Sequence, residues 1–81
     1  MIQYEVRLRW GYKITPIEVE KETETSVLVN GRRRAKATAY DQIFKTLPEA
    51  KQVMIARCER EINEYEKRIS EAREALVDLK R

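Results

Sequence analysis

The chain has 81 residues, of which 38 % are charged, and a formal net charge of +3. A domain of this size has a marginal core unless staples or oligomerisation support it, and the single cysteine excludes an intramolecular disulfide framework. Because the chain has no histidine, it lacks the usual proton shuttle and the commonest metal ligand, so we expect no enzyme, no cofactor and no metal site.

Residues 2 to 10 alternate between apolar and polar side chains. Tyr4 and Val6 belong to the apolar set, which runs from Ile2 to Trp10, and Gln3 and Glu5 belong to the polar set. This pattern predicts a half-buried strand whose polar set faces solvent. The charged, alternating start differs from a signal sequence, and nowhere do 18 apolar residues run together. We therefore expect a soluble, cytoplasmic protein without a membrane partner.

A second strand is expected over about residues 13 to 21, and it contains Pro16. Proline has no amide to donate to a neighbouring strand, so this strand should lie at a sheet edge or carry a bulge. Ile17 and Val19 are expected to face inward.

The clearest hairpin surrounds Asn30 and Gly31, the residues most tolerant of positive φ. A two-residue turn would place Val27 opposite Arg34, so that an apolar residue would face a charged one. A shift of one residue places Val27 opposite Ala35, so that facing residues match, and this register is preferred. The sequence thus predicts a three- or four-stranded antiparallel meander within residues 1–45.

One long helix is predicted over residues 46–81, which completes a single α+β domain. Thr46, Pro48 and Glu49 form a capping box with proline in the first turn. No glycine or proline follows Pro48. A helix from Leu47 to Lys80 is roughly 50 Å long, whereas a nine-residue strand spans only about 30 Å. The helix must therefore project beyond its own sheet.

The helix carries a heptad repeat of apolar residues, which we call the helix seam. Its members are Ile55, Cys58, Ile62, Tyr65, Ile69, Ala72, Leu76 and Leu79. So narrow a stripe is typical of a helix that packs against another helix, and the chain contains no second helix of comparable length. The seam therefore predicts a homodimer interface in which Cys58 is a buried, inert apolar residue.

The width of the apolar stripe favours an antiparallel pair. The stripe is broad over residues 50–58, narrow over 59–74 and broad again over 75–79. An antiparallel alignment that pairs Ile55 with Leu79 of the second copy would bring the two broad ends together.

Charges beside the helix seam favour the same orientation. In a parallel pair Glu61 would face Glu66 of the second copy, and Arg68 would face Arg73 of the second copy, so both flanks of the interface would be repulsive. In the antiparallel pair Glu59 lies near Arg73, although Glu66 and Arg68 each approach their own copies. Because exposed pairs contribute only a few tenths of a kcal/mol each, the preference is small.

The densest positive cluster lies at the hairpin tip and is a second candidate binding site. Its arginines could contact phosphates or an acidic protein, or they could simply pair with glutamates across the sheet. Nearby tyrosines could add stacking contacts. The candidate partner-binding residues are Arg32, Arg33, Arg34, Lys36, Tyr40 and Tyr12.

Residues 26–51 combine a strand, the Asn30-Gly31-Arg32-Arg33 turn, Tyr40, Phe44 and the Thr46-Leu47-Pro48-Glu49-Ala50-Lys51 cap before a long charged helix. This segment resembles small uncharacterised phage and bacterial proteins with a β-meander and a long helix. The resemblance implies a phage-linked context and brings no catalytic residues. The sequence thus favours a non-catalytic, homodimeric module that binds a larger protein, for instance as a phage-encoded inhibitor or adaptor of a host or defence protein. The alternative is a small dimeric nucleic-acid-binding protein that uses the Arg32–Arg34 hairpin.

Overall fold

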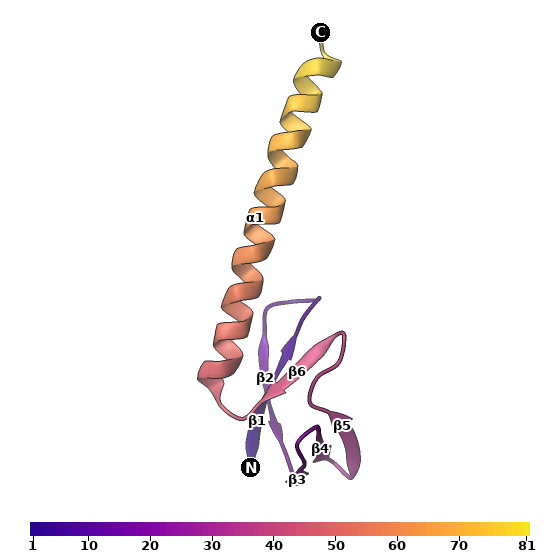
Figure 1. The fold of residues 1–81 in the computed structure, drawn as a ribbon, viewed down its shortest axis with the longest axis vertical. Helices are drawn as coiled ribbons and strands as arrows, with labels where there is room; N and C mark the ends of the chain where they lie inside the picture. Colours follow the sequence, from indigo (N-terminus) through magenta and orange to yellow (C-terminus); the bar gives the residue numbers. More distant parts are fainter.

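The computed structural model describes residues 1–81 as six strands followed by one helix (Figure 1). The α+β class and the order of antiparallel strands before a single long helix are confirmed. The molecule is elongated, with principal extents of 63 × 22 × 18 Å. The elements are β1 (Ile2–Arg7), β2 (Ile14–Glu18), β3 (Lys21–Glu22), β4 (Ser26–Val29), β5 (Arg32–Ala35), β6 (Asp41–Phe44) and α1 (Leu47–Leu79).

The strands form two three-stranded antiparallel sheets instead of one meander, in the orders β2-β1-β6 and β3-β4-β5. The last strand, β6, returns to pair with β1 and sets Glu5 opposite Ile43. The strand expected over 13–21 is divided, since β2 ends at Glu18 and β3 begins at Lys21. Pro16 lies on β2 at the edge of its sheet, as its missing amide predicted.

Strand β1 lies at the centre of the fold and is covered on both faces. Val6 packs against Ala50 and Met54 of α1. The prediction that the polar set of β1 faces solvent is wrong, because Gln3 and Glu5 are buried. The alternating pattern identified the strand correctly, but the second sheet covers the face that the pattern assigned to water.

The layer between the two sheets combines a small apolar cluster with paired polar groups. Val19, Val27 and Ile43 form the apolar cluster. Beside it, the Gln3 amide donates a 3.0 Å hydrogen bond to Glu22, and Arg34 forms a salt bridge with Glu5. These partners compensate much of the desolvation cost of burying polar groups, as buried polar residues require.

The preferred register of the β4–β5 hairpin is wrong. The structure has the two-residue turn, with Val27 opposite Arg34. Asn30 and Gly31 both adopt positive φ, 51° and 74°, which matches the twist of the flanking strands. The register does not waste the inner face, because Arg34 reaches across to the buried Glu5.

The start of α1 follows its capping signal. The Thr46 hydroxyl accepts a hydrogen bond from the amide of Glu49, and the same hydroxyl donates to the Glu49 carboxylate at 2.9 Å. The first three turns of α1, up to Cys58, pack on the strands, and the rest of α1 projects away from them (Figure 1). No helix combines the length and the apolar character that a membrane span requires.

Candidate functional site

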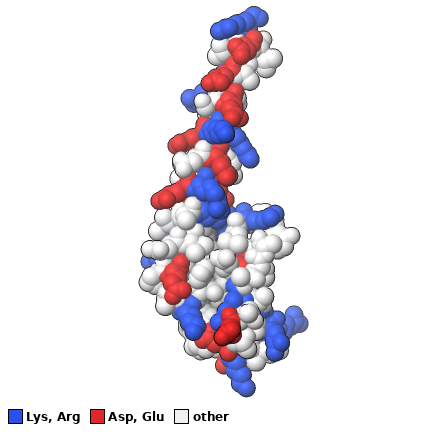
Figure 2. Space-filling model, viewed as in Figure 1, with Lys and Arg blue, Asp and Glu red and all other residues white.

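The most prominent surface is the projecting part of α1, residues Ile62–Leu79. Every residue in this range is exposed, and acidic and basic side chains are interspersed along it (Figure 2). Among the helix seam residues, Ile62 is 55 % exposed and Leu79 is 82 % exposed. The seam therefore lies open along the whole projecting helix.

The first part of the helix seam is less accessible. Cys58 is half-buried and packs against the Val6–Ala50–Met54 core, whereas Ile55 is exposed. The structure thus places all of the predicted interface residues except Cys58 on open surface. No group of three or more acidic, cysteine or histidine side chains is placed to hold a metal ion.

Arg57 fixes the end of the sheet to the helix, and sequence reasoning missed it. Its side chain is only 3 % exposed. Nη1 donates to the carbonyl oxygens of Arg7 at 2.6 Å and Gly11 at 2.7 Å, and Nε donates to Glu61 at 3.1 Å. An arginine in a charged helix is normally exposed, so no sequence signal distinguished this one from its neighbours.

The same contacts hold Tyr12 beside the helix seam. The Arg57 guanidinium lies over the Tyr12 ring, 4.8 Å from its centroid, and the Tyr12 hydroxyl donates a 2.5 Å hydrogen bond to Glu61. This hydrogen bond raises the pKa of Tyr12 above its ordinary value and is the main cause of the lowered pKa of Glu61. Tyr12 is thereby oriented at the base of the projecting helix.

Around Tyr12 the surface forms a shallow, mainly apolar depression, which we call the socket. Its volume is about 160 Å³. Four of its residues come from α1 at successive spacings of three, one and three residues, and the fifth comes from the β1–β2 loop. The lining residues are Tyr12, Cys58, Glu61, Ile62 and Tyr65.

The predicted basic cluster at the hairpin does not form one surface. Arg34 pairs with Glu5 and lies 3.8 Å from Asp41, and Lys36 pairs with Glu22 at 3.0 Å. Arg32 and Arg33 are exposed and are neighbours on β5, so they point to opposite faces. Arg34 thus joins the two sheets, Lys36 pairs with β3 of the second sheet, and only Arg32 and Arg33 remain free at the tip.

Glu22 is the acceptor at the centre of this arrangement. It accepts hydrogen bonds from Gln3 and Lys36, and its other oxygen lies 3.2 Å from the Lys45 ammonium. These contacts, with that from Lys36 the largest, lower its pKa to about 2. In the sequence, glutamates occupy the alternate positions 18, 20, 22 and 24. Only the fold shows that Glu22 is the one with three partners.

Tyr40 lies away from the arginine hairpin and beside Trp10. The Thr38 hydroxyl accepts from the amides of Tyr40 and Asp41, both at 3.1 Å, and so fixes the turn before β6. The rings of Trp10 and Tyr40 stack, with centroids 6.1 Å apart, and Arg9 lies over Tyr40. The expectation that Trp10 faces inward is wrong: β1 ends at Arg7, and Trp10 is 66 % exposed.

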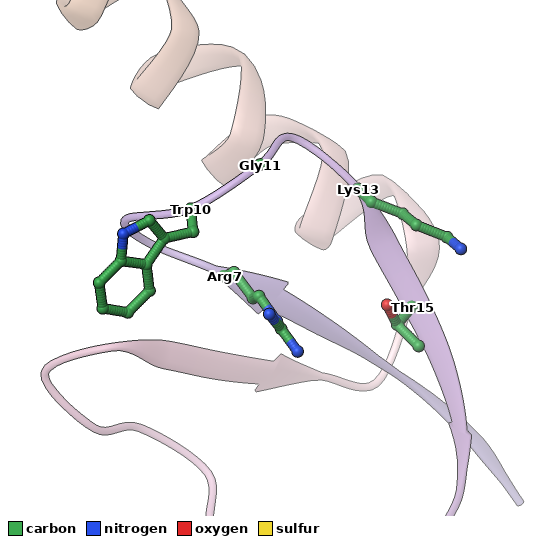
Figure 3. A pocket seen from close by; sticks show the side chains of 5 residues that line it. All are labelled: Arg7, Trp10, Gly11, Lys13 and Thr15. Atoms are coloured by element: carbon green, nitrogen blue, oxygen red, sulfur yellow. The ribbon is translucent and has the colours of Figure 1, made fainter.

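An open groove of about 400 Å³ adjoins Trp10 at this end of the sheet. In Figure 3 the indole of Trp10 and the ammonium of Lys13 project from opposite sides of the β1–β2 loop, with the Arg7 side chain between them. Gly11 and Thr15 complete the lining. This end of the molecule therefore combines an exposed aromatic pair with several cations.

No protein-family model matches the chain, and the comparisons with curated proteins and with solved structures likewise found no match.

Proposed function

We propose that this protein is a non-catalytic protein-interaction module that forms a homodimer through its helix. The observation that carries the proposal is the open helix seam beyond the sheets, where Ile62, Ile69 and Leu76 are each more than half exposed at intervals of seven residues. Exposure of an apolar stripe of this length to water costs free energy, and packing against a second helix with the same spacing removes the stripe from water.

The second copy is the occupant that best fits the seam. An α1 helix from another copy carries the same heptad spacing and a balanced set of charges, eight basic and eight acidic residues from position 47 to 81. The orientation is antiparallel, because a parallel pair brings Glu61 to Glu66 and Arg68 to Arg73. We call the β-sheet region before the helix, residues 1–45, the head. The antiparallel pair places its two heads at opposite ends.

The heads present two copies of a binding surface to a larger protein. The β4–β5 hairpin, with the exposed Arg32 and Arg33, lies at one end of each head, and the β1–β2 loop lies at the other (Figure 1). That loop carries Trp10, which stacks on Tyr40. A dimer with separated heads can bind a large target at two sites at once. Because the second binding event is then intramolecular, the overall affinity exceeds that of a single head. In a phage context such binding would inhibit or adapt a host protein.

Sedimentation equilibrium across micromolar concentrations tests the homodimer. We expect the wild-type protein to be dimeric at tens of micromolar. The double variant Ile62→Asp/Ile69→Asp should be monomeric, because each dimer would place four carboxylates in an apolar interface. A matched control, Asn63→Asp/Ser70→Asp, adds the same charge outside the seam and should remain dimeric. A monomeric wild-type protein, or a double seam variant that dimerises as well as wild type, would refute the proposal.

A second candidate function is binding of single-stranded nucleic acid, and the stacked Trp10–Tyr40 pair favours it. Both rings are more than half exposed, Arg9 lies over the Tyr40 ring, and Arg7 and Lys13 line the groove that adjoins Trp10. Exposed aromatic rings beside cations are the usual platform on which bases stack while the backbone is neutralised. The surface for this function is thus the Trp10 end of the head, with Arg32 and Arg33 at a separate location.

Intrinsic fluorescence tests this candidate directly, since Trp10 is the only tryptophan. Addition of a short oligonucleotide should quench its emission at low salt, and the quenching should weaken steeply as salt is raised. Arg7→Gln/Lys13→Gln should reduce the affinity, whereas Arg32→Gln/Arg33→Gln removes the same charge at the hairpin and should change it less. Unchanged emission at low salt would exclude this candidate.

A further inference from the structure

The charges on one flank of the helix seam form a pattern that an antiparallel copy can match. Glu59, Glu66, Arg73 and Lys80 follow each other at seven-residue intervals, each four residues after a seam residue. None has a charged residue three or four positions away in the helix, and none takes part in a salt bridge within the chain. Four charged side chains on one helix flank are therefore without an internal partner.

The order of these charges is acidic, acidic, basic, basic. In an antiparallel pair the row of one copy runs opposite to the row of the other. Glu66 then lies near Arg73 of the second copy and Glu59 lies near its Lys80, and the two-fold symmetry makes each contact occur twice. The alignment that does this places Ile62 opposite Leu79 of the second copy. The alignment with Ile55 opposite Leu79 gives the attractive Glu59–Arg73 contact, but it also sets Glu66 against its own copy.

The socket supplies an independent reason for the same alignment. Cys58, Glu61, Ile62 and Tyr65 are four helix residues of the kind that receive a single side chain from a facing helix, as in knobs-into-holes packing. With Ile62 opposite Leu79, the side chain that enters the socket is Leu79. With Ile55 opposite Leu79 it is Ala72, whose methyl group would leave most of the depression empty.

We propose that two copies pair antiparallel with Ile62 of each chain opposite Leu79 of the other, and that each Leu79 occupies the socket closed by Tyr12 of the second copy. The proposal rests on the homodimer proposed above and specifies its register. The overlap from Ile62 to Leu79 is roughly 27 Å long at 1.5 Å per residue. It coincides with the part of α1 that is exposed throughout.

The inferred register explains two features that a simple pair of helices would not. Leu79 is the most exposed of the large apolar residues, at 82 %, and the socket covers it. Tyr12 lies outside α1 but is held against it through Glu61 and Arg57. The interface is therefore built from the helix of one chain together with a loop from the head of the other.

The dissociation constants of charge-reversal variants test the register of the two helices. At low salt Glu66→Lys and Arg73→Glu should each raise the dimer dissociation constant about tenfold, because each turns two attractive contacts into repulsive ones. The double variant Glu66→Lys/Arg73→Glu recreates both contacts with the signs exchanged and should return to within about threefold of wild type. Helix content by circular dichroism should be equal in all four proteins.

Other arrangements give different results. If Ile55 faced Leu79, Glu66→Lys would have little effect and the double variant would remain as weak as Arg73→Glu. If the helices were parallel, each single reversal would strengthen the dimer. Either result would overturn the register while leaving the homodimer intact, whereas monomeric wild-type protein would refute both.

Disulfide trapping and socket variants complete the test. In a Cys58→Ala background, a mixture of the Glu66→Cys and Arg73→Cys proteins should oxidise to a mixed dimer, and Glu66→Cys alone should not cross-link to itself. Leu79→Ala and Tyr12→Ala should each weaken the dimer. Val77→Ala removes an equally apolar, exposed residue outside the seam and should have little effect. Self-cross-linking of Glu66→Cys, or equal effects of Leu79→Ala and Val77→Ala, would contradict the proposal.

Discussion

The guanidinium of Arg57 donates a 2.7 Å hydrogen bond to the carbonyl oxygen of Gly11. This contact joins the third turn of α1, at the end of the part that covers the sheet, to the loop between β1 and β2. Because the next residue is Tyr12, the same contact positions the aromatic side of the socket. A buried arginine thus links the stability of the head to the shape of the surface on which we propose the second copy docks.

Replacement of Arg57 by alanine should strongly destabilise the head. The change removes a buried cation that bonds two carbonyl oxygens and Glu61, and we expect the free energy of unfolding to fall by about 2–4 kcal/mol. Urea denaturation measures the loss. Arg60→Ala, at an exposed position of the same helix, should cost no more than about 0.5 kcal/mol. Equal losses in the two variants would contradict the structural role of Arg57.

The Glu22 carboxylate should make stability depend on acid pH. Its pKa is about 2 in the folded protein, below its ordinary value of 4.5, so its contribution to stability is fully present above pH 4.5 and is lost as the pH falls toward 2. Glu22→Gln should therefore be less stable than wild type near neutral pH, and the difference should shrink as the pH falls below about 4.5. Thermal unfolding followed across this range measures it. Glu24→Gln, an exposed neighbour, serves as the control.

Gly31 should be the residue least tolerant of substitution in the β4–β5 turn. Its φ of +74° lies in the left-handed region, although no atom lies within 4 Å of an added Cβ. Gly31→Ala should therefore cost about 1 kcal/mol through backbone strain alone. Asn30→Gly, at the preceding positive-φ position, should be nearly neutral. Denaturation midpoints of both variants test this expectation, which a fully stable Gly31→Ala protein would contradict.

The Cys58 thiol should report on dimer formation. It lines the socket, so a disulfide reagent should modify it more slowly as the protein concentration rises and Leu79 of a second copy covers it. The Ile62→Asp/Ile69→Asp variant, which we expect to be monomeric, should react at a rate independent of protein concentration. Identical behaviour of the two proteins would argue against burial of the socket in the dimer.

The sequence predicted the local structure of this chain most successfully at the helix. The Thr46 cap and Pro48 in the first turn located the start of α1 within a residue, and the absence of later glycine or proline agrees with a helix that continues to Leu79. The heptad repeat also predicted which of its residues would form an apolar stripe. These signals act between residues a few positions apart, where backbone preferences and side-chain spacing decide the outcome.

The arrangement of the strands was less predictable because it depends on contacts between distant residues. Strand β6 is short and was not expected, yet it pairs with β1 and closes the first sheet. The sequence pattern predicts the wrong register for the β4–β5 hairpin, because matching apolar residues across the strands takes no account of a distant partner for Arg34. Its partner, Glu5, lies 29 residues away and on the other sheet.

By itself, then, the sequence determined one projecting helix with an apolar seam and an antiparallel β region before it. Only the tertiary structure decided that Gln3, Glu5 and Arg57 are buried, that Arg34 and Lys36 are engaged within the head, and that Tyr12 stands beside the seam. The physical reason is that an alternating pattern assumes one wet face, whereas a central strand with layers on both sides buries polar side chains once each finds a partner. Those partners come from elements far apart in the chain.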